Sequence, residues 1–498
     1  MCIRDSPYFG RVRFEGREVD DFYVGLMGIE QNNHYYVYDW RAPICELFYD
    51  YGLGKAKYKS PNGEIEGKIT LKRQYEIEDG KLINMYDKDL NLYDEYLQKV
   101  LGRISTDRLH NIASTIQSEQ NEIIRDLKHD LVIVQGYAGS GKTTVALHRI
   151  AYALYRLKDL SSANILIFTL NEAFMSHIEG VLPELGEQNT RSATLAKFAG
   201  RLLKLPKHFE ESDMFLARFL GLKETEQNKI AAKLDLSIKQ KVVEWVENLV
   251  NNTVATKGFK VADVPFSTQL LNRLFTRDYC DLPYLNRINA VADFVAKKIK
   301  REGDAAARVQ ILRHVAACFG AKLDIEALYT DFCESMGFGI PDLSVIKTED
   351  AILMCLLKNK LEDMIIKMDI RHIVIDEAQE YPPLFLDFLL HLFPRAQFSI
   401  FGDKYQQTNP LGVGDLSQII DLQAHYGESV VYTLDNTYRS SEEIVEFSSR
   451  LIGNPRHNAF RLLNNEPVEV REIADTNSQV ASQILSILEN EITKKGTI

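Results

Sequence analysis

A glycine-rich segment that follows a short apolar run constrains the fold of this chain most strongly. Residues 131–134 are four consecutive apolar side chains, as expected of a strand buried in a parallel sheet. The following Gly136-Tyr-Ala-Gly-Ser-Gly-Lys-Thr143 matches the pattern GxxxxGK[ST], and a helical pattern comes next. Backbone N–H groups of such a loop and the helix N-terminus bind phosphate oxygens. We therefore expect nucleotide phosphates to bind at Gly136, Gly139, Ser140, Gly141, Lys142, Thr143 and Thr144.

A second motif supplies the carboxylates that such a site needs. Ile373-Val-Ile-Asp376-Glu377 places two acids directly after a predicted strand, at the sheet edge where ligands bind. We expect Thr143 and Asp376 to hold Mg²⁺, the latter through water, and Glu377 to be the general base. Lys142 would reach the β- and γ-phosphates. Alone, this motif is equally consistent with a strand that ends in solvated acids, but together the two motifs favour a nucleoside triphosphatase.

The order of the predicted elements indicates an α/β fold with a parallel sheet. A helical pattern follows the loop and a second apolar strand is predicted over 165–168, which completes a βαβ unit. About 165 residues then carry no strand signal, and residues 201–365 have the pattern of amphipathic helices broken near Pro206, Pro265, Pro283 and Pro341. Strands are predicted again over 373–375, 398–401 and 430–432. The sheet is therefore expected to be interrupted by a large helical insertion.

The two ends of the chain differ from this pattern. Residues 7–80 hold short runs rich in Tyr, Phe, Val and Gly between turn signals, which predicts a small β-rich module. From about residue 90 to 127 the pattern becomes helical and polar. A helix predicted over 478–493 runs into a Gly stop close to the last residue, and residues 1–6 show no relation to the β-pattern. We expect an open reading frame that is incomplete at both ends.

The charge balance narrows the kinds of partner. The chain has 59 Lys and Arg against 70 Asp and Glu, a net charge of −11, so tight nonspecific binding to nucleic acid is not expected of the whole protein. Residues 201–300 hold 17 basic and 12 acidic side chains, so a local basic groove remains an alternative. The six cysteines form no CxxC pair, so we expect neither a zinc site nor disulfides. Without an apolar run of roughly 18 residues or a signal peptide, the protein is expected to be cytoplasmic, with no membrane contact.

Further motifs, in a fixed order, resemble those of a family of motor ATPases. Phe401-Gly-Asp-Lys-Tyr-Gln406 and Leu434-Asp-Asn-Thr-Tyr-Arg439-Ser follow apolar strands, and Gln120 lies 22 residues before Lys142. With the two motifs above, they resemble the superfamily-1 helicases of the UvrD/Rep type. Segments 39–44, 115–125 and 181–187 lie outside the shared motifs and resemble the HelD-type ATPases, which are RNA polymerase recycling motors related to DNA helicase IV. The resemblance covers nearly the whole chain from Tyr8 onward.

This resemblance implies roles for particular residues. Gln120 reads the adenine edge of ATP, Tyr438 stacks on the ring, Gln406 contacts the γ-phosphate and Arg439 acts as an arginine finger. It implies ATP and Mg²⁺ as ligands, RNA polymerase core as partner and single-stranded nucleic acid as a second candidate partner. It also divides the chain into a β-rich module (1–90), a first RecA-like ATPase domain (91–200 and 366–428) split by a helical insertion (201–365), and an incomplete second RecA-like domain (429–498).

Three departures from the helicase pattern affect the expected activity. Thr169 stands where such helicases carry an aromatic side chain, and Gln407-Thr-Asn-Pro410 replaces an aromatic-Arg-Gly segment. Base stacking contributes roughly 1–3 kcal/mol per base, so their loss argues against processive translocation on a strand. The last two helicase motifs would lie beyond Ile498, and the coiled coil of HelD-type proteins would precede Tyr8. We therefore expect this chain to bind nucleotide poorly and to hydrolyse it slowly.

Three functional hypotheses follow. The first is an ATPase that releases RNA polymerase from nucleic acid, with residues 201–365 either as a polymerase-contacting arm or as a helical subdomain that packs on the motor. The second is a 3′-to-5′ DNA helicase of the UvrD/Rep type acting in repair. The third is a nonenzymatic scaffold, which the substitution Lys142→Ala would not affect.

Overall fold

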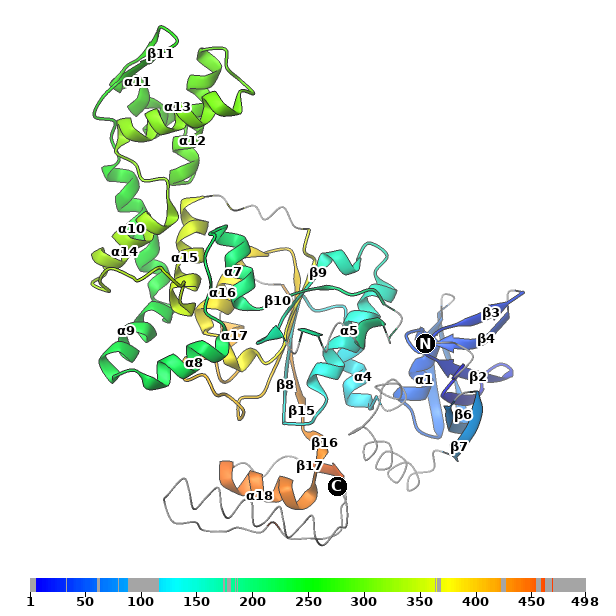
Figure 1. Ribbon diagram of the computed structural model, residues 1–498. Helices are drawn as coiled ribbons and strands as arrows, with labels where there is room; N and C mark the ends of the chain where they lie inside the picture. The colour runs from blue at the N-terminus through cyan, green and yellow to red at the C-terminus, as the bar shows by residue number, and fades with distance from the viewer. Residues whose placement is uncertain are drawn as a thin grey trace, which may run out of the picture.

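A parallel sheet with helices on both faces forms the centre of the structure, with a β-module on one side and a helical insertion on the other (Figure 1). The structure is a computed structural model. It describes residues 6–32, 34–60, 63–78, 80–87, 116–172, 175–176, 181–183, 185, 187–362, 364, 369–421, 427–453, 458–461 and 468. The helix predicted over 478–493 and the helical pattern before residue 116 lie outside these ranges.

The central sheet has six parallel strands in the order β10-β9-β13-β14-β8-β15. They are β8 (Leu131–Gly136), β9 (Ile165–Phe168), β10 (Arg191–Ala193), β13 (His372–Ile375), β14 (Gln397–Gly402) and β15 (Ser429–Leu434). This order confirms the α/β fold with a parallel sheet. We assigned β15 to the second RecA-like domain, which is wrong for this strand: Ser429 pairs with Leu131 and Leu434 with Gly136, so β15 completes the first sheet.

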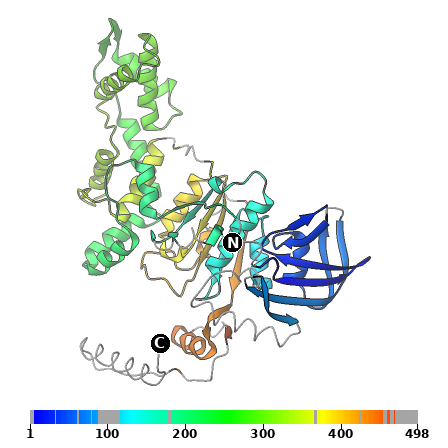
Figure 2. The same cartoon turned by 45° about the vertical axis from the view of Figure 1, so that its right-hand side comes forward.

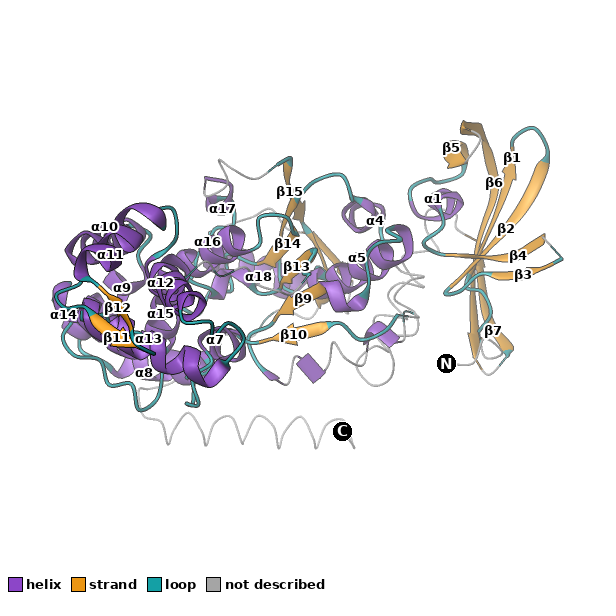
Figure 3. Ribbon diagram, turned by 90° about the horizontal axis from the view of Figure 1, so that it is seen from above, coloured by secondary structure: helices purple, strands orange, loops and turns teal. Residues whose placement is uncertain are grey.

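Successive side chains of each strand point to opposite faces of the sheet and contribute to two separate hydrophobic cores. Leu131 and Ile133 of β8 contribute to the core shared with the insertion, whereas Val132 and Val134 contribute to the core on the opposite face. Short continuous apolar runs therefore suffice for these strands, because both faces are covered. Helices α7 (Leu195–Leu203), α15 (Thr348–Leu361) and α16 (Pro383–Leu392) cover the first face, and α4 (Ser118–Arg125) and α5 (Lys142–Arg156) cover the second (Figure 3).

The N-terminal module is a curved, mostly antiparallel sheet in the order β3-β4-β2-β1-β6-β5, with β7 also paired to β6 (Figure 2). The predicted β-rich module is present. Its core is continuous with that of α4 and α5 and includes Trp40 and Phe48. The elements are β1 (Gly10–Glu15), β2 (Val19–Gly25), β3 (Ile29–Gln31), β4 (His34–Asp39), the 3-10 turn Pro43–Cys45, α1 (Glu46–Tyr49), β5 (Gly54–Ser60), β6 (Gly63–Glu78) and β7 (Lys81–Asp87).

The insertion has a base packed against the sheet and a distal part that extends away from it (Figure 1). The distal part contains a hairpin of two three-residue strands, β11 (Phe259–Val261) and β12 (Val264–Phe266). The apolar periodicity of the sequence did not predict these strands. Besides α15, the insertion's helices are α8 (Ser212–Gly221), α9 (Glu224–Leu234), α10 (Ile238–Asn252), α11 (Thr268–Arg273), the π-helical turn Leu274–Asp278, α12 (Tyr284–Lys298), α13 (Ala305–Phe319) and α14 (Ile325–Ser335).

After β15 the chain forms a small separate unit. It consists of β16 (Asn436–Ser441), α18 (Glu442–Ile452) and β17 (Asn458–Arg461), and β16 pairs in parallel with β17. The short helix α17 (Gln418–Asp421) precedes β15, and the short turns Ser162–Asn164 and Ala378–Glu380 flank β9 and β13. Within the part of the chain described by the structure, no helix is both long and apolar enough to cross a bilayer.

Candidate nucleotide-binding site

The loop between β8 and α5 has the backbone shape of a phosphate-binding loop. Gly139 and Gly141 have φ values of +75° and +86°, which favour glycine. A Cβ atom on Gly139 would lie 2.4 Å from Cβ of Arg439, so the loop also has no room for a side chain there. Ser140 is buried and its Oγ has no hydrogen-bond partner among the described residues. Because buried polar atoms are normally paired, this orphaned hydroxyl fits a site that receives phosphate oxygens.

Lys142 is the first residue of α5 and is held at the mouth of the loop. Its Nζ donates hydrogen bonds to the carbonyl oxygens of Gly136 at 2.8 Å and Tyr137 at 3.1 Å, and lies 3.9 Å from Oδ2 of Asp403. Burial lowers the pKa of Lys142, and the carboxylate of Asp403 opposes that shift. A charged ammonium in this buried position is stabilised further by an anion such as a phosphate.

Thr143 and Asp376 meet across the sheet edge as the sequence predicts. Thr143 Oγ1 donates to Asp376 Oδ2 at 2.6 Å, and the N–H of Glu377 donates to Asp376 Oδ1 at 3.0 Å. Burial, followed by the negative charge of Glu377, raises the pKa of Asp376 to about 6. Mg²⁺ in nucleotide sites commonly takes one or two protein oxygens together with phosphate oxygens and water. The hydroxyl and carboxylate of this pair fit that ion.

Glu377 and Gln406 line one cleft of about 310 Å³ beside Asp376. Glu377 has φ +51°, an uncommon value for a residue with a side chain, and its Oε2 accepts a hydrogen bond from Gln379 Nε2 at 2.7 Å. The Oε1 atom of Gln379 accepts from the N–H of Asp403 at 3.0 Å. Gln379 therefore links the ends of β13 and β14 and orients Glu377. We did not predict a role for this glutamine, although its place two residues after a motif carboxylate was a usable signal.

Gln120 and Tyr438 both contact the phosphate-binding loop. Gln120, in the first turn of α4, donates from Nε2 to the carbonyl oxygen of Ser140 at 3.0 Å. The N–H of Tyr438 donates to the carbonyl oxygen of Gly139 at 2.9 Å, and its hydroxyl donates to Glu119 Oε1 at 3.1 Å. With Arg439 against Gly139, the structure brings every predicted site residue to the carboxyl edge of one sheet.

The two positions that lack base-stacking aromatics are held by polar contacts. Thr169 is buried, and its hydroxyl donates to the carbonyl oxygen of Asn171 at 3.3 Å. Glu380 accepts hydrogen bonds from the N–H groups of Thr408 at 2.7 Å and Asn409 at 2.8 Å, and from the Thr408 hydroxyl at 2.9 Å. Glu380 therefore fixes the loop that replaces the aromatic-Arg-Gly segment.

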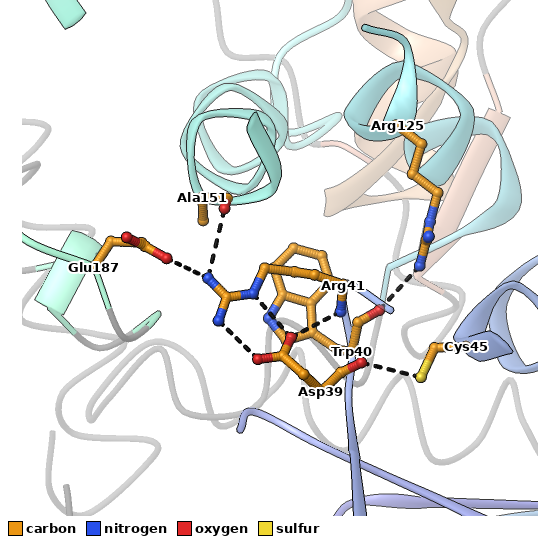
Figure 4. Close-up of polar contacts among 7 residues, drawn as sticks. All are labelled: Asp39, Trp40, Arg41, Cys45, Arg125, Ala151 and Glu187. Atoms are coloured by element: carbon orange, nitrogen blue, oxygen red, sulfur yellow. Dashed lines mark hydrogen bonds and ion pairs between the residues drawn. The ribbon is translucent and has the colours of Figure 1, made fainter. Parts of the chain in front are cut away.

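The segment 39–44, which carries part of the HelD-type resemblance, joins the β-module to helix α5 (Figure 4). Trp40 is fully buried in the core of the β-module. Arg41, however, forms ion pairs with Asp39 at 2.7 Å and with Glu187, and its NH1 lies 3.5 Å from the carbonyl oxygen of Ala151 in α5. Residues from two of the segments that carried the HelD-type resemblance therefore meet at one contact.

Comparisons with known proteins agree with this geometry. The family model of the UvrD/REP helicase N-terminal domain matches residues 116–408, and the model of the N-terminal domain of DNA helicase IV HelD matches residues 2–101. Two relatives from Staphylococcus epidermidis strains, each named ATP-dependent DNA helicase PcrA, are 27% identical over 122 residues. That stretch covers 24% of this chain and only 16% of each relative.

Proposed function

Because this chain belongs to the UvrD/REP helicase family and its N-terminal region matches that of HelD, we propose that it is an ATP-driven motor that releases RNA polymerase from nucleic acid. The hydrogen bond between Thr143 and Asp376, beside Lys142, carries the ATPase part of this proposal. The proposal keeps the domain division given above, with the second RecA-like domain beginning after β15. A polymerase partner implies a cytoplasmic protein.

The proposed roles of the site residues follow from where they lie. Lys142 and the loop N–H groups bind the β- and γ-phosphates, while Thr143 and Asp376 hold Mg²⁺. Bound Mg²⁺ neutralises charge that develops on the transferred phosphoryl group. Glu377, oriented by Gln379, accepts a proton from the attacking water, and Gln406 at the same cleft contacts the γ-phosphate. Gln120 reads adenine, Tyr438 stacks on its ring, and Arg439 acts as an arginine finger.

The surface beside the catalytic cleft favours a protein partner over a DNA strand. Thr169 is buried, and Glu380 fixes the loop at Thr408, so neither position presents an aromatic ring to a base. Without such rings, binding of a single strand loses roughly 1–3 kcal/mol per base.

A 3′-to-5′ DNA helicase acting in repair is the second candidate. It is favoured by the names of the two relatives, both DNA helicases, and by the excess of basic side chains within residues 201–300. Those basic residues belong to the insertion, whose distal part extends away from the sheet. The insertion is also the candidate polymerase-contacting arm of the first proposal.

The two candidates differ in what stimulates ATP hydrolysis. We propose to measure phosphate release from ATP with no addition, with core RNA polymerase and with single-stranded DNA, and to follow release of polymerase from a DNA–RNA scaffold. A polymerase-recycling motor is stimulated by polymerase and releases it with ATP, and Lys142→Ala abolishes both effects. Stimulation by DNA alone would instead support the helicase. Polymerase release by the Lys142→Ala variant would support a nonenzymatic scaffold.

A further inference from the structure

Helix α4 carries Gln120, the expected adenine-reading residue, and its Glu119 contacts Tyr438, the expected stacking residue. Gln120 lies against the phosphate-binding loop, and Glu119 accepts hydrogen bonds from Tyr438 and from Asn436 Nδ2 at 2.8 Å. The helix has only eight residues, and isolated helices of this length are not stable in water. What packs against α4 therefore decides where Gln120 and Glu119 lie.

One set of contacts joins α4 to the ATPase domain. Arg149 of α5 is buried, and its NH1 donates to the carbonyl oxygen of Ile123 at 2.7 Å. Ile123 and Ile124 are buried in the core that α4 shares with α5. These contacts hold the middle of the short helix.

The second set joins α4 to the β-module. Asn121 Nδ2 donates to Asp50 Oδ1 at 2.7 Å, and Arg125 NH2 donates to the carbonyl oxygen of Trp40 at 2.9 Å. Arg125 Nε also donates to Asn121 Oδ1 at 3.0 Å, which couples the two contacts. The Arg125 side chain is only 9% exposed, so its guanidinium depends on these acceptors.

The β-module is itself anchored on α5, so it offers a fixed reference for α4. The Trp40 ring packs edge-on against the His148 ring of α5 at 5.2 Å, and Arg41 pairs with Asp39 and Glu187 beside Ala151 (Figure 4). Figure 4 shows Arg125 reaching the same turn from α4. One short turn of the β-module therefore contacts both helices that border the nucleotide site.

We infer that the N-terminal β-module positions α4 and thereby sets the selectivity of the site for adenine, with Arg125 as the positioning residue. This rests on the proposed role of Gln120 in reading the base. Five residues, about 7.5 Å along a helix, separate Gln120 from Arg125, so loss of the Arg125 anchor tilts the end that carries Gln120. The phosphate contacts come from the loop after β8, outside α4, and are retained.

The test compares binding of the hydrolysis-resistant imido analogues of ATP and GTP, with Mg²⁺, by isothermal titration calorimetry. For Arg125→Gln we expect ATP-analogue binding to weaken by about tenfold, the effect of losing one hydrogen bond between the Gln120 amide and adenine, with GTP-analogue binding unchanged. Asp50→Ala removes the β-module's contact with Asn121 and should lower the ratio of ATP-analogue to GTP-analogue affinity in the same way. Arg125→Lys, which can still donate to Trp40, should restore part of the selectivity.

Arg73→Gln is the matched control. It removes the exposed ion pair of Arg73 with Asp87 within the β-module and should leave both affinities unchanged. Equal weakening of both analogues, or an unchanged ratio in both Arg125→Gln and Asp50→Ala, would overturn the inference. A wild-type protein that binds both analogues equally would overturn it while leaving the phosphate site intact. A wild-type protein that binds neither would refute the proposed function as well.

Discussion

Acid should weaken the contact between the β-module and α5 through His148. This side chain is fully buried in α5, and its Nδ1 lies 2.8 Å from the carbonyl oxygen of Thr144. A carbonyl oxygen only accepts, so the neutral ring carries its proton on Nδ1. The other nitrogen, Nε2, has no partner among the described residues, and a second proton there would create a buried, unpaired charge.

The size of the effect follows from the pKa of His148. Burial lowers it from 6.5 to about 4. The unfolded protein therefore binds a proton more readily, so the stability from neutral His148 is complete above pH 6.5 and is lost as the pH falls towards 4. At pH 5 the free energy of unfolding is therefore lower by about 2 kcal/mol, because it falls by roughly 1.4 kcal/mol for each pH unit below 6.5.

The two tryptophans of the chain allow a local assay. Trp245→Phe leaves Trp40, which packs on His148, as the single fluorescent reporter of this contact. We would measure urea unfolding at pH 7.5 and pH 5 in this background, with and without His148→Asn. Asparagine still offers an N–H donor towards Thr144, and the small cavity that it leaves costs the same at both pH values.

Between pH 7.5 and pH 5, the free energy of unfolding should fall by about 2 kcal/mol more in the Trp245→Phe protein with His148 than in the one with His148→Asn. Burial, followed by the charge of Arg149, lowers the pKa of His372 to about 3, but this residue is present in both proteins and its effect cancels. Equal losses in the two proteins would show that His148 does not carry the acid sensitivity and would refute the reasoning.

Two further predictions concern the nucleotide site. Gly139→Ala should weaken ATP binding, measured by calorimetry, at least tenfold. Gly139 has a φ of +75°, which disfavours a side chain, and the added Cβ would lie 2.4 Å from Cβ of Arg439. Near-normal affinity would contradict the assigned loop geometry. Thr143→Val should lower Mg²⁺-dependent phosphate release by roughly 100-fold, since it removes a metal-binding hydroxyl and the 2.6 Å hydrogen bond to Asp376. Thr143→Ser, which keeps the hydroxyl, is the control and should retain most of the activity.

The sequence predicts correctly those motifs and strands that consist of contiguous residues. The loop at Gly136–Thr143 and the carboxylates after β13 each occupy one short stretch, and the run of apolar residues in each buried strand marks the sheet. Since the carboxyl ends of parallel strands share one edge, the meeting of Thr143 with Asp376, 233 positions apart, could also be anticipated. The apolar runs did not show which sheet the last strand joins. Residues 429–434 pair with β8, and only that pairing places them.

By itself, the sequence determined the parallel sheet and the family and predicted a phosphate-binding loop, because each depends on local pattern and on the order of motifs. Only the tertiary structure decided how the β-module is joined to the motor. Arg41 meets Glu187 across 146 positions, and Arg125 meets Trp40 across 85. Charged side chains of this kind are usually solvated, and nothing in their spacing selects a partner. Their partners are selected when folding buries them beside Trp40 and His148, where an unpaired charge would be costly.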